Sequence, residues 1–169
     1  MGAFVGAMFA MGLSPSEIRA RCHEELVVRR PLGDYAVPVT SLVRGGRARA
    51  MLARTFGPEP AIEELEREFF CVSCDLVNGE QVVHKSGSVA QAVAASMCLP
   101  GIFTPIRQAE SLLVDGGVLD SLPVRPMVET MEGPIVAVDV GRRFDHARPQ
   151  AGRGARIAAR WAAARTGRR

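Results

Sequence analysis

Asp115, Gly116 and Gly117 are the residues of this sequence whose types and spacing point most clearly to chemistry. Residues 111–114 predict a short apolar strand that leads directly into Asp115. A carboxylate at the end of a sheet strand is where α/β proteins build sites, and two glycines let the backbone turn tightly beside it. Asp115 is therefore a candidate base, although Asp-Gly-Gly alone is more often a purely structural turn.

Cys71 and Cys74 have the C-x-x-C spacing that is typical of a zinc or redox pair. They lie in an apolar run of strand character, where positions three apart point to opposite faces. No second cysteine pair or Cys/His pair follows at zinc spacing. We therefore expect buried structural thiols in a reducing compartment, with no metal and no cofactor.

The histidines do not indicate a catalytic triad. His23 is expected within a helix, His84 in a strand and His146 in the C-terminal tail, so none has the setting of a triad base. We expect all three to be structural or solvated. The serines nearest to these segments also have ordinary settings, in a strand, at a helix start or within a helix: Ser73, Ser86, Ser88 and Ser96.

The first elements are two helices. Residues 2–11 are apolar on almost every face and predict a buried helix that ends at Gly12. Ser14, Pro15 and Glu17 form a capping-box pattern, which predicts a second helix to about residue 29.

Helices and strands alternate in the rest of the chain. The pattern predicts helices near residues 48–54, 61–68, 89–97 and 126–131, and strands at 69–77, 81–85, 111–114 and 134–140. Asn78-Gly79 predicts the turn of a hairpin. Residues 134–140 are continuously apolar, as expected for a strand buried on both faces. The sequence therefore predicts an α/β fold with a parallel or mixed sheet covered by helices.

Several ordered segments resemble the patatin-like phospholipase family, in its bacterial and neuropathy-target-esterase branch. Residues 113–124 are similar to the family's aspartate motif, in which Asp-Gly-Gly is followed by an asparagine and a proline. Residues 92–105 look like the helix and proline-rich turn beside the active site, and residues 69–87 are similar to a further segment of this branch. Three residues depart from the pattern, because Asp120-Ser121 stands where Asn-Asn is usual and Cys98 where serine is frequent.

The resemblance implies a Ser–Asp dyad on a three-layer α/β sandwich with a mainly parallel central sheet. Asp115 would be the base, and the serine would sit in Gly-x-Ser-x-Gly on a sharp turn into a helix. In this register Gly2 is the last glycine of that motif, and the serine directly precedes Met1. We therefore expect the 169-residue chain to lack the nucleophile, its strand, the first strand and the oxyanion loop.

Charge divides the chain into a body and a tail. Residues 142–169 contain nine arginines and one acid and therefore carry a charge of +8. Because the whole chain has a net charge of +3, residues 1–141 carry −5. We expect residues 1–141 to be a partial patatin-like domain, and 142–169 to be a disordered or weakly helical basic tail. The tail pattern around Trp161 allows peripheral membrane contact in a cytoplasmic protein, whereas no base-reading motif indicates nucleic acid.

Two functions remain open at this stage. The family implies a lipid acyl hydrolase that cleaves phospholipids or lysophospholipids through an acyl-enzyme. The alternative is a non-catalytic pseudoenzyme or lipid-binding remnant. Reaction of the purified chain with a fluorophosphonate probe would distinguish the two, because only an activated serine is labelled.

Overall fold

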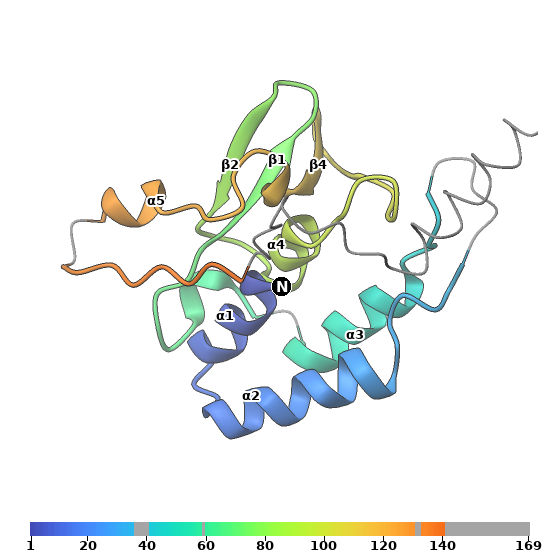
Figure 1. Ribbon diagram of the computed structural model, residues 1–169, viewed down its shortest axis with the longest axis horizontal. Coiled ribbons are helices and arrows are strands. Elements are labelled where there is room, and N and C mark those ends of the chain that lie inside the picture. Colours follow the sequence, from blue (N-terminus) through green and yellow to red (C-terminus); the bar gives the residue numbers. More distant parts are fainter. Residues whose placement is uncertain (36–40, 59, 131–132, 141–169) are drawn as a thin grey trace, which may run out of the picture. The chain divides into compact units, whose positions relative to one another are not determined.

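The structure is a computed structural model that describes residues 1–35, 41–58, 60–130 and 133–140 (Figure 1). Met1–Ala137 form one compact unit, and the residues from Val138 onward belong to a second. The predicted basic tail lies outside the described residues, as does His146. In the part of the chain that is described, no helix is both long and apolar enough to cross a membrane.

The two N-terminal helices form as predicted. Helix α1 (Gly2–Ala10) ends in a Schellman-type turn, because Gly12 has φ 89° and the N–H of Leu13 donates to the carbonyl of Met8. Helix α2 (Pro15–Cys22) starts with the predicted capping box, in which the Ser14 hydroxyl accepts from the N–H of Glu17. It continues as a six-residue π-helix, His23–Val28, to the predicted end.

Helix α3 (Gly46–Phe56) is longer than the sequence predicts. Its first turn is capped from a distance, since a carboxylate oxygen of Asp34 accepts the N–H of Arg47 at 3.1 Å. Arg54 near its other end makes a two-bond ion pair with the buried Glu25, at 2.7 and 3.2 Å. This hydrogen-bonded pair lowers the pKa of Glu25 and fastens α3 to the π-helix.

Helix α4 (Val89–Ser96) lies between the sheet on one side and α1 and α3 on the other (Figure 1). Its N-cap is Ser88, as predicted, and its small and β-branched side chains allow close packing. Phe4 of α1 and Phe56 of α3 meet edge-to-face with their ring centroids 5.7 Å apart. The core around them also contains Ala7, Met8, Met51, Leu52, Val89 and Val93.

The sheet is antiparallel at every described pairing, which differs from the predicted mainly parallel sheet. Strands β1 (Cys71–Asp75), β2 (Glu80–His84), β3 (Ile106–Gln108) and β4 (Ser111–Asp115) have the order β2-β1-β4-β3. Two of the three pairings are hairpins, and short turns can join only antiparallel neighbours. The third, between β1 and β4, is antiparallel across a long connection that includes α4. Gly79 closes the first hairpin with φ 69°, and Ala109 closes the second with φ 50°. The fold is thus α/β, with helices packed on an antiparallel sheet.

Two predicted elements are wrong. Residues 134–140 form no strand, and Val136, Val138 and Val140 are 87%, 70% and 90% exposed. An apolar run becomes a buried strand only where neighbouring strands accept its backbone, and no strand of the described residues pairs with this segment.

Residues 61–68 form only the short 3-10 helix Ile62–Glu64, not the predicted acidic helix. Contacts distant in sequence replace the helical hydrogen bonds: the N–H of Arg67 donates to Ala10, and the Glu63 carboxylate accepts the N–H of Gly87. Helix α5 (Arg125–Val128) is present but shorter than predicted.

Candidate active site

Asp115 lies at the last position of β4, at the junction with a short 3-10 helix, Gly116–Val118. Its backbone N–H donates to the carbonyl of Cys98 at 2.8 Å, which ties the strand end to the turn after α4. Its Oδ1 atom accepts the N–H of Gly117 at 2.8 Å. This one carboxylate oxygen is held by the turn, and the residue lines a cavity.

Close approach requires a glycine at Gly116 and leaves little room for a side chain at Gly117. A Cβ on Gly116 would lie 2.7 Å from Cγ2 of Val72 and 2.8 Å from the Val72 carbonyl oxygen. A Cβ on Gly117 would lie 3.2 Å from Oδ1 of Asp115. The glycines therefore let the turn pack on β1 and wrap the carboxylate.

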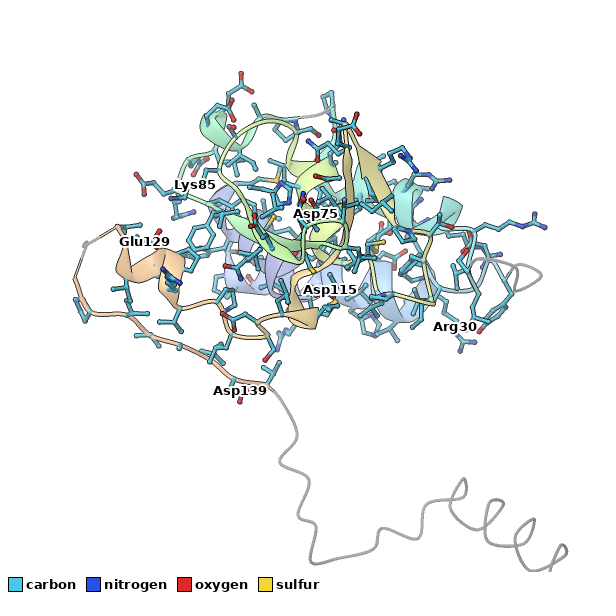
Figure 2. All side chains as sticks on the ribbon, turned by 90° about the horizontal axis from the view of Figure 1, so that it is seen from above. Arg30, Asp75, Lys85, Asp115, Glu129 and Asp139 are labelled. Carbon is cyan, nitrogen blue, oxygen red and sulfur yellow. The ribbon has the colours of Figure 1, made fainter. Side chains whose placement is uncertain are left out.

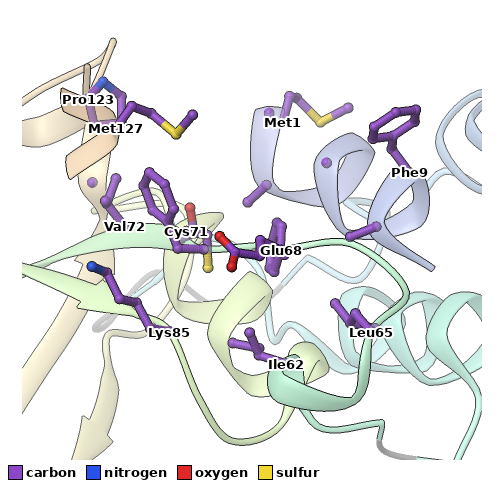
Figure 3. Close-up of a pocket in the computed structure, with 18 of the residues that line it drawn as sticks. Met1, Phe9, Ile62, Leu65, Glu68, Cys71, Val72, Lys85, Pro123 and Met127 are labelled. Carbon is purple, nitrogen blue, oxygen red and sulfur yellow. The ribbon is translucent and has the colours of Figure 1, made fainter. Parts of the chain in front are cut away.

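A cavity of about 950 Å³ brings the predicted site residues together. Gly2, Asp115, Gly116 and Gly117 all line it, although more than a hundred residues separate the first from the others. The cavity also follows α1 as far as Phe9 and Ala10. Figure 3 shows Met1 on one side of this space and Pro123 and Met127 on the other.

The start of α1 opens into this cavity, and its end is held by Arg67. The first N–H groups of a helix have no partner within the helix and carry partial positive charge. Met1 and Gly2 line the cavity, so this end of α1 faces the same space as Asp115. At the other end, the Arg67 guanidinium donates to the Phe9 carbonyl at 2.6 Å and stacks 4.6 Å from the Phe9 ring. A cation at a helix C-terminus is favourable and fixes the helix here.

Ser73 and His84 form a hydrogen-bonded pair that sequence reasoning missed. The Ser73 hydroxyl lies 2.8 Å from Nε2 of His84, because the β1–β2 register makes the two side chains diagonal neighbours. Ser73 is 0% exposed, so no substrate can reach it, and burial lowers the pKa of His84. The pair is structural, in agreement with the separate predictions for the two residues. Only the hairpin register, with Asn78-Gly79 as turn, could have revealed it from sequence.

Ser96, at the end of α4, lines the cavity together with Asp115. It is the last residue of a helix and not part of a strand-to-helix turn. An elbow presents its hydroxyl at a helix N-terminus, where the N–H groups help to activate it. Ser96 therefore has the position but not the local geometry of a nucleophile.

Cys71 and Cys74 have the buried environment predicted for them. Cys71 and Cys74 are both buried and unbridged in β1, and burial raises the pKa of Cys71 to about 12. Burial also raises the pKa of Cys98, whose thiol donates to the Thr104 carbonyl at 3.3 Å. Thiols of raised pKa are poor nucleophiles. Across the described ranges no group of three or more His, Cys, Asp and Glu residues could hold a metal ion.

Comparison with known proteins identifies the family of this chain. The family model "Patatin-like phospholipase" matches residues 1–128, a range that includes the cavity residues of α1 and β4. The chain belongs to the patatin-like phospholipase family. An uncharacterized NTE family protein of Mycobacterium bovis is 41% identical over 143 residues, which cover 85% of this chain and 24% of that protein. The corresponding protein of Mycobacterium tuberculosis H37Rv matches with the same identity and coverage.

Yeast relatives carry a functional name. Lysophospholipase NTE1 of Meyerozyma guilliermondii is 36% identical over 145 residues, which cover 83% of this chain and 10% of that protein. The patatin-like chain thus spans about a quarter or less of the length of these relatives. Its similarity to them supports a phospholipase-type lipid hydrolase by family.

Proposed function

We propose that residues 1–130 form the aspartate half of a phospholipase- or lysophospholipase-type serine esterase. The observation that carries this proposal is the shared cavity, into which the start of α1 and the Asp115-Gly116-Gly117 turn both open. A catalytic serine and its base must lie within hydrogen-bond reach of each other. In the family register the serine directly precedes Met1, at the end of α1 that faces Asp115.

The reaction needs only this serine, Asp115 and water. The Asp115 carboxylate takes the hydroxyl proton while the serine oxygen attacks the ester carbonyl of the lipid. The proton then passes to the leaving alcohol, and an acyl-enzyme forms. Water next attacks the acyl carbon and gives one proton to Asp115. Asp115 passes this proton to the serine oxygen as the acyl–oxygen bond breaks, which releases the fatty acid and restores the serine hydroxyl. Backbone N–H groups of the family's glycine-rich loop and of α1 would stabilise the oxyanion.

The walls of the cavity suit an acyl chain. Apolar side chains from α1 and from the segment before β1 line it: Phe9, Ile62, Leu65, Phe69 and Phe70. Burial of a lipid chain against such a wall contributes about 0.8 kcal/mol per CH₂. The name of the yeast relatives indicates lysophospholipid as the substrate class. We propose that the complete fold is a three-layer sandwich in which further strands extend the described sheet.

The proposal is tested by extending the chain. The 169-residue chain is compared with an extended version in which the family's glycine-rich loop and its Gly-x-Ser segment are placed ahead of Met1. We expect the extended chain to hydrolyse p-nitrophenyl butyrate and a short-chain lysophospholipid, and the 169-residue chain to show only background. Equal activity of both chains would contradict the proposed role of the serine ahead of Met1.

A non-catalytic lipid-binding chain is the second candidate. It is favoured by the positions of Ser73 and Ser96, because neither is an exposed elbow serine beside Asp115. This candidate predicts that the 169-residue chain binds lysophospholipid but does not react with a fluorophosphonate probe. Labelling of any serine within residues 1–169 would refute it.

We further propose that residues 142–169 bring the protein to a membrane surface as a peripheral contact. The nine arginines of this tail would interact with anionic headgroups, each by about 1 kcal/mol near the surface. Co-sedimentation with vesicles containing phosphatidylserine should fall when these residues are deleted. Unchanged co-sedimentation of the deletion variant would contradict the idea.

A further inference from the structure

Lys85 is the only lysine of the sequence, and it lines the cavity that contains Asp115. It follows the last residue of β2 directly, so the strand fixes the start of its side chain. Figure 3 shows Lys85 beside Val72 on the wall of the cavity, and Figure 2 shows its position relative to Asp115. The one lysine side chain thus shares a cavity with the candidate base, as does the N-terminal residue Met1.

The other charged side chains that line the cavity have hydrogen-bond partners, except that of Glu68. Glu63 accepts the N–H of Gly87, Asp115 that of Gly117 and Asp120 that of Leu122, at 2.8, 2.8 and 3.0 Å. Arg67 is held by the carbonyl and ring of Phe9.

Lys85 and Glu68 are the charged residues that remain in the lining. Neither makes a hydrogen bond or ion pair with any residue that the structure describes. Among the lining side chains, Lys85 is therefore the cation that is available for a ligand.

We propose that Lys85 binds the phosphate of a lysophospholipid in this cavity. An ammonium group has three donors and no acceptor, so it binds the non-bridging oxygens of a phosphodiester as a compact point charge. In a lysophospholipid the glycerol carbons separate this phosphate from the acyl ester by a fixed number of bonds. Binding the phosphate on one wall would therefore position the ester relative to Asp115. The inference rests on the proposed function for its link to catalysis, but the binding step itself needs no serine.

Because Lys85 is the only lysine, its protection can be measured directly. The 169-residue chain is treated with an amine-reactive acetylating reagent, and acetylation at Lys85 and at the Met1 α-amine is followed separately by peptide mass spectrometry. The probes are a short-chain lysophosphatidylglycerol below its micelle concentration, glycerophosphoglycerol, inorganic phosphate and the matching neutral monoacylglycerol.

We expect the lysophospholipid to slow acetylation of Lys85 severalfold and the neutral monoacylglycerol to leave its rate unchanged. Glycerophosphoglycerol should protect weakly, because it lacks the acyl chain. Equal protection by the neutral lipid would overturn the proposal, since the acyl chain alone would then cover Lys85. Protection by inorganic phosphate without protection by the lysophospholipid would also overturn it, since the site would bind free phosphate only.

Matched variants measure the charge contribution. Lys85→Gln should weaken lysophospholipid binding by about three- to tenfold, because an exposed charge-assisted contact is screened by water. Lys85→Arg should retain most of the affinity. Glu68→Gln removes the opposite charge from the same cavity and should leave the affinity equal or higher. Equal losses in Lys85→Gln and Glu68→Gln would contradict a specific role of Lys85.

Failure of this inference and failure of the proposed function have different signatures. If Lys85 is protected but the serine-extended chain hydrolyses no ester, the binding inference stands and the proposed function fails. If the extended chain hydrolyses lysophospholipid and Lys85→Gln does not change its preference over p-nitrophenyl butyrate, the proposed function stands and the inference fails.

Discussion

Asp75 and Asp115 end neighbouring strands of one sheet, yet their surroundings differ in almost every respect (Figure 2). Asp75 is 2% exposed, and its carboxylate accepts four hydrogen bonds, from the N–H groups of Val77 and Leu112 and the side chains of Asn78 and Ser111. The carboxylate of Asp115 has one hydrogen bond, from Gly117, and lines the cavity.

The comparison separates a structural carboxylate from one that is available for chemistry. A carboxylate whose lone pairs are all engaged by backbone and side-chain donors is stabilised as an anion. These hydrogen bonds lower the pKa of Asp75 to about 2, and the one from the Val77 N–H contributes most. Such a group is a weak base and holds the β1–β2 turn against β4. A position at a strand end therefore does not distinguish the two aspartates; the number of hydrogen-bond donors and access to the cavity do.

The largest expected effect is on catalysis at Asp115. In the serine-extended chain, Asp115→Asn should reduce kcat for p-nitrophenyl butyrate by about 10²–10⁴, because the amide cannot take the serine proton. The thermal midpoint should change little. Asp120→Asn is the matched control, since Asp120 lines the same cavity, and it should retain activity. Equal losses in the two variants would remove the distinction of Asp115.

The second effect is on stability at Asp75. Asp75→Ala leaves four donors without their acceptor, and we expect the thermal midpoint of the 169-residue chain to fall by roughly 5 °C or more. Thermal unfolding followed by circular dichroism checks this. A fall of similar size in Asp115→Asn would show that the two aspartates are alike in structural role.

Gly116 tests the packing that carries Asp115. Gly116→Ala places a Cβ 2.7 Å from the Val72 side chain and 2.8 Å from its carbonyl oxygen, so we expect a loss of about 1–3 kcal/mol in the free energy of unfolding. In Gly2→Ala the added Cβ has no atom within 4 Å, so this control should not be destabilised. Denaturant titration measures both variants. A neutral Gly116→Ala would show that the turn is not held tightly against β1.

Acid pH should act on Asp75. Because its pKa is lower in the folded than in the unfolded chain, its contribution to stability is present above about pH 3.8 and is lost as the pH falls toward 2. Asp75→Asn should flatten this part of the stability curve, as measured by urea titration between pH 5 and 2. An unchanged slope in the variant would contradict the assignment.

The smallest effect is expected at His84. Burial lowers its pKa below 6.5, so protonation favours the unfolded chain and stability should decrease as the pH falls below 6.5. His84→Gln, which keeps a group able to bond Ser73, should weaken this decrease. The check is the pH dependence of the thermal midpoint between pH 7 and 5, and a variant with the same dependence would contradict it.

The local signals in the sequence predicted the elements that depend on local chemistry. The capping box at Ser14 and Glu17, the cap at Gly12 and the hairpin turn at Asn78-Gly79 are all present, since each is decided within a few residues. The 134–140 strand and the 61–68 helix were wrong because partners elsewhere in the chain decide them.

In the candidate active site, too, local motifs could be predicted from the sequence and long-range contacts could not. Asp115, Gly116 and Gly117 could be identified from their motif, and all three line the cavity with Gly2. The donors around Asp75, the Ser73–His84 pair and the exposure of Lys85 to the cavity depend on strand register and packing. No local pattern in the sequence encodes these contacts.

The central claim is that the start of α1 and the Asp115 turn are two parts of one active site. Fluorophosphonate labelling of the serine-extended chain, with the modified residue mapped by mass spectrometry, tests it most directly. We predict labelling of the serine directly ahead of Met1, and loss of this labelling in Asp115→Asn. Labelling of Ser96 or Ser73, or labelling of the elbow serine that Asp115→Asn leaves unchanged, would contradict the claim.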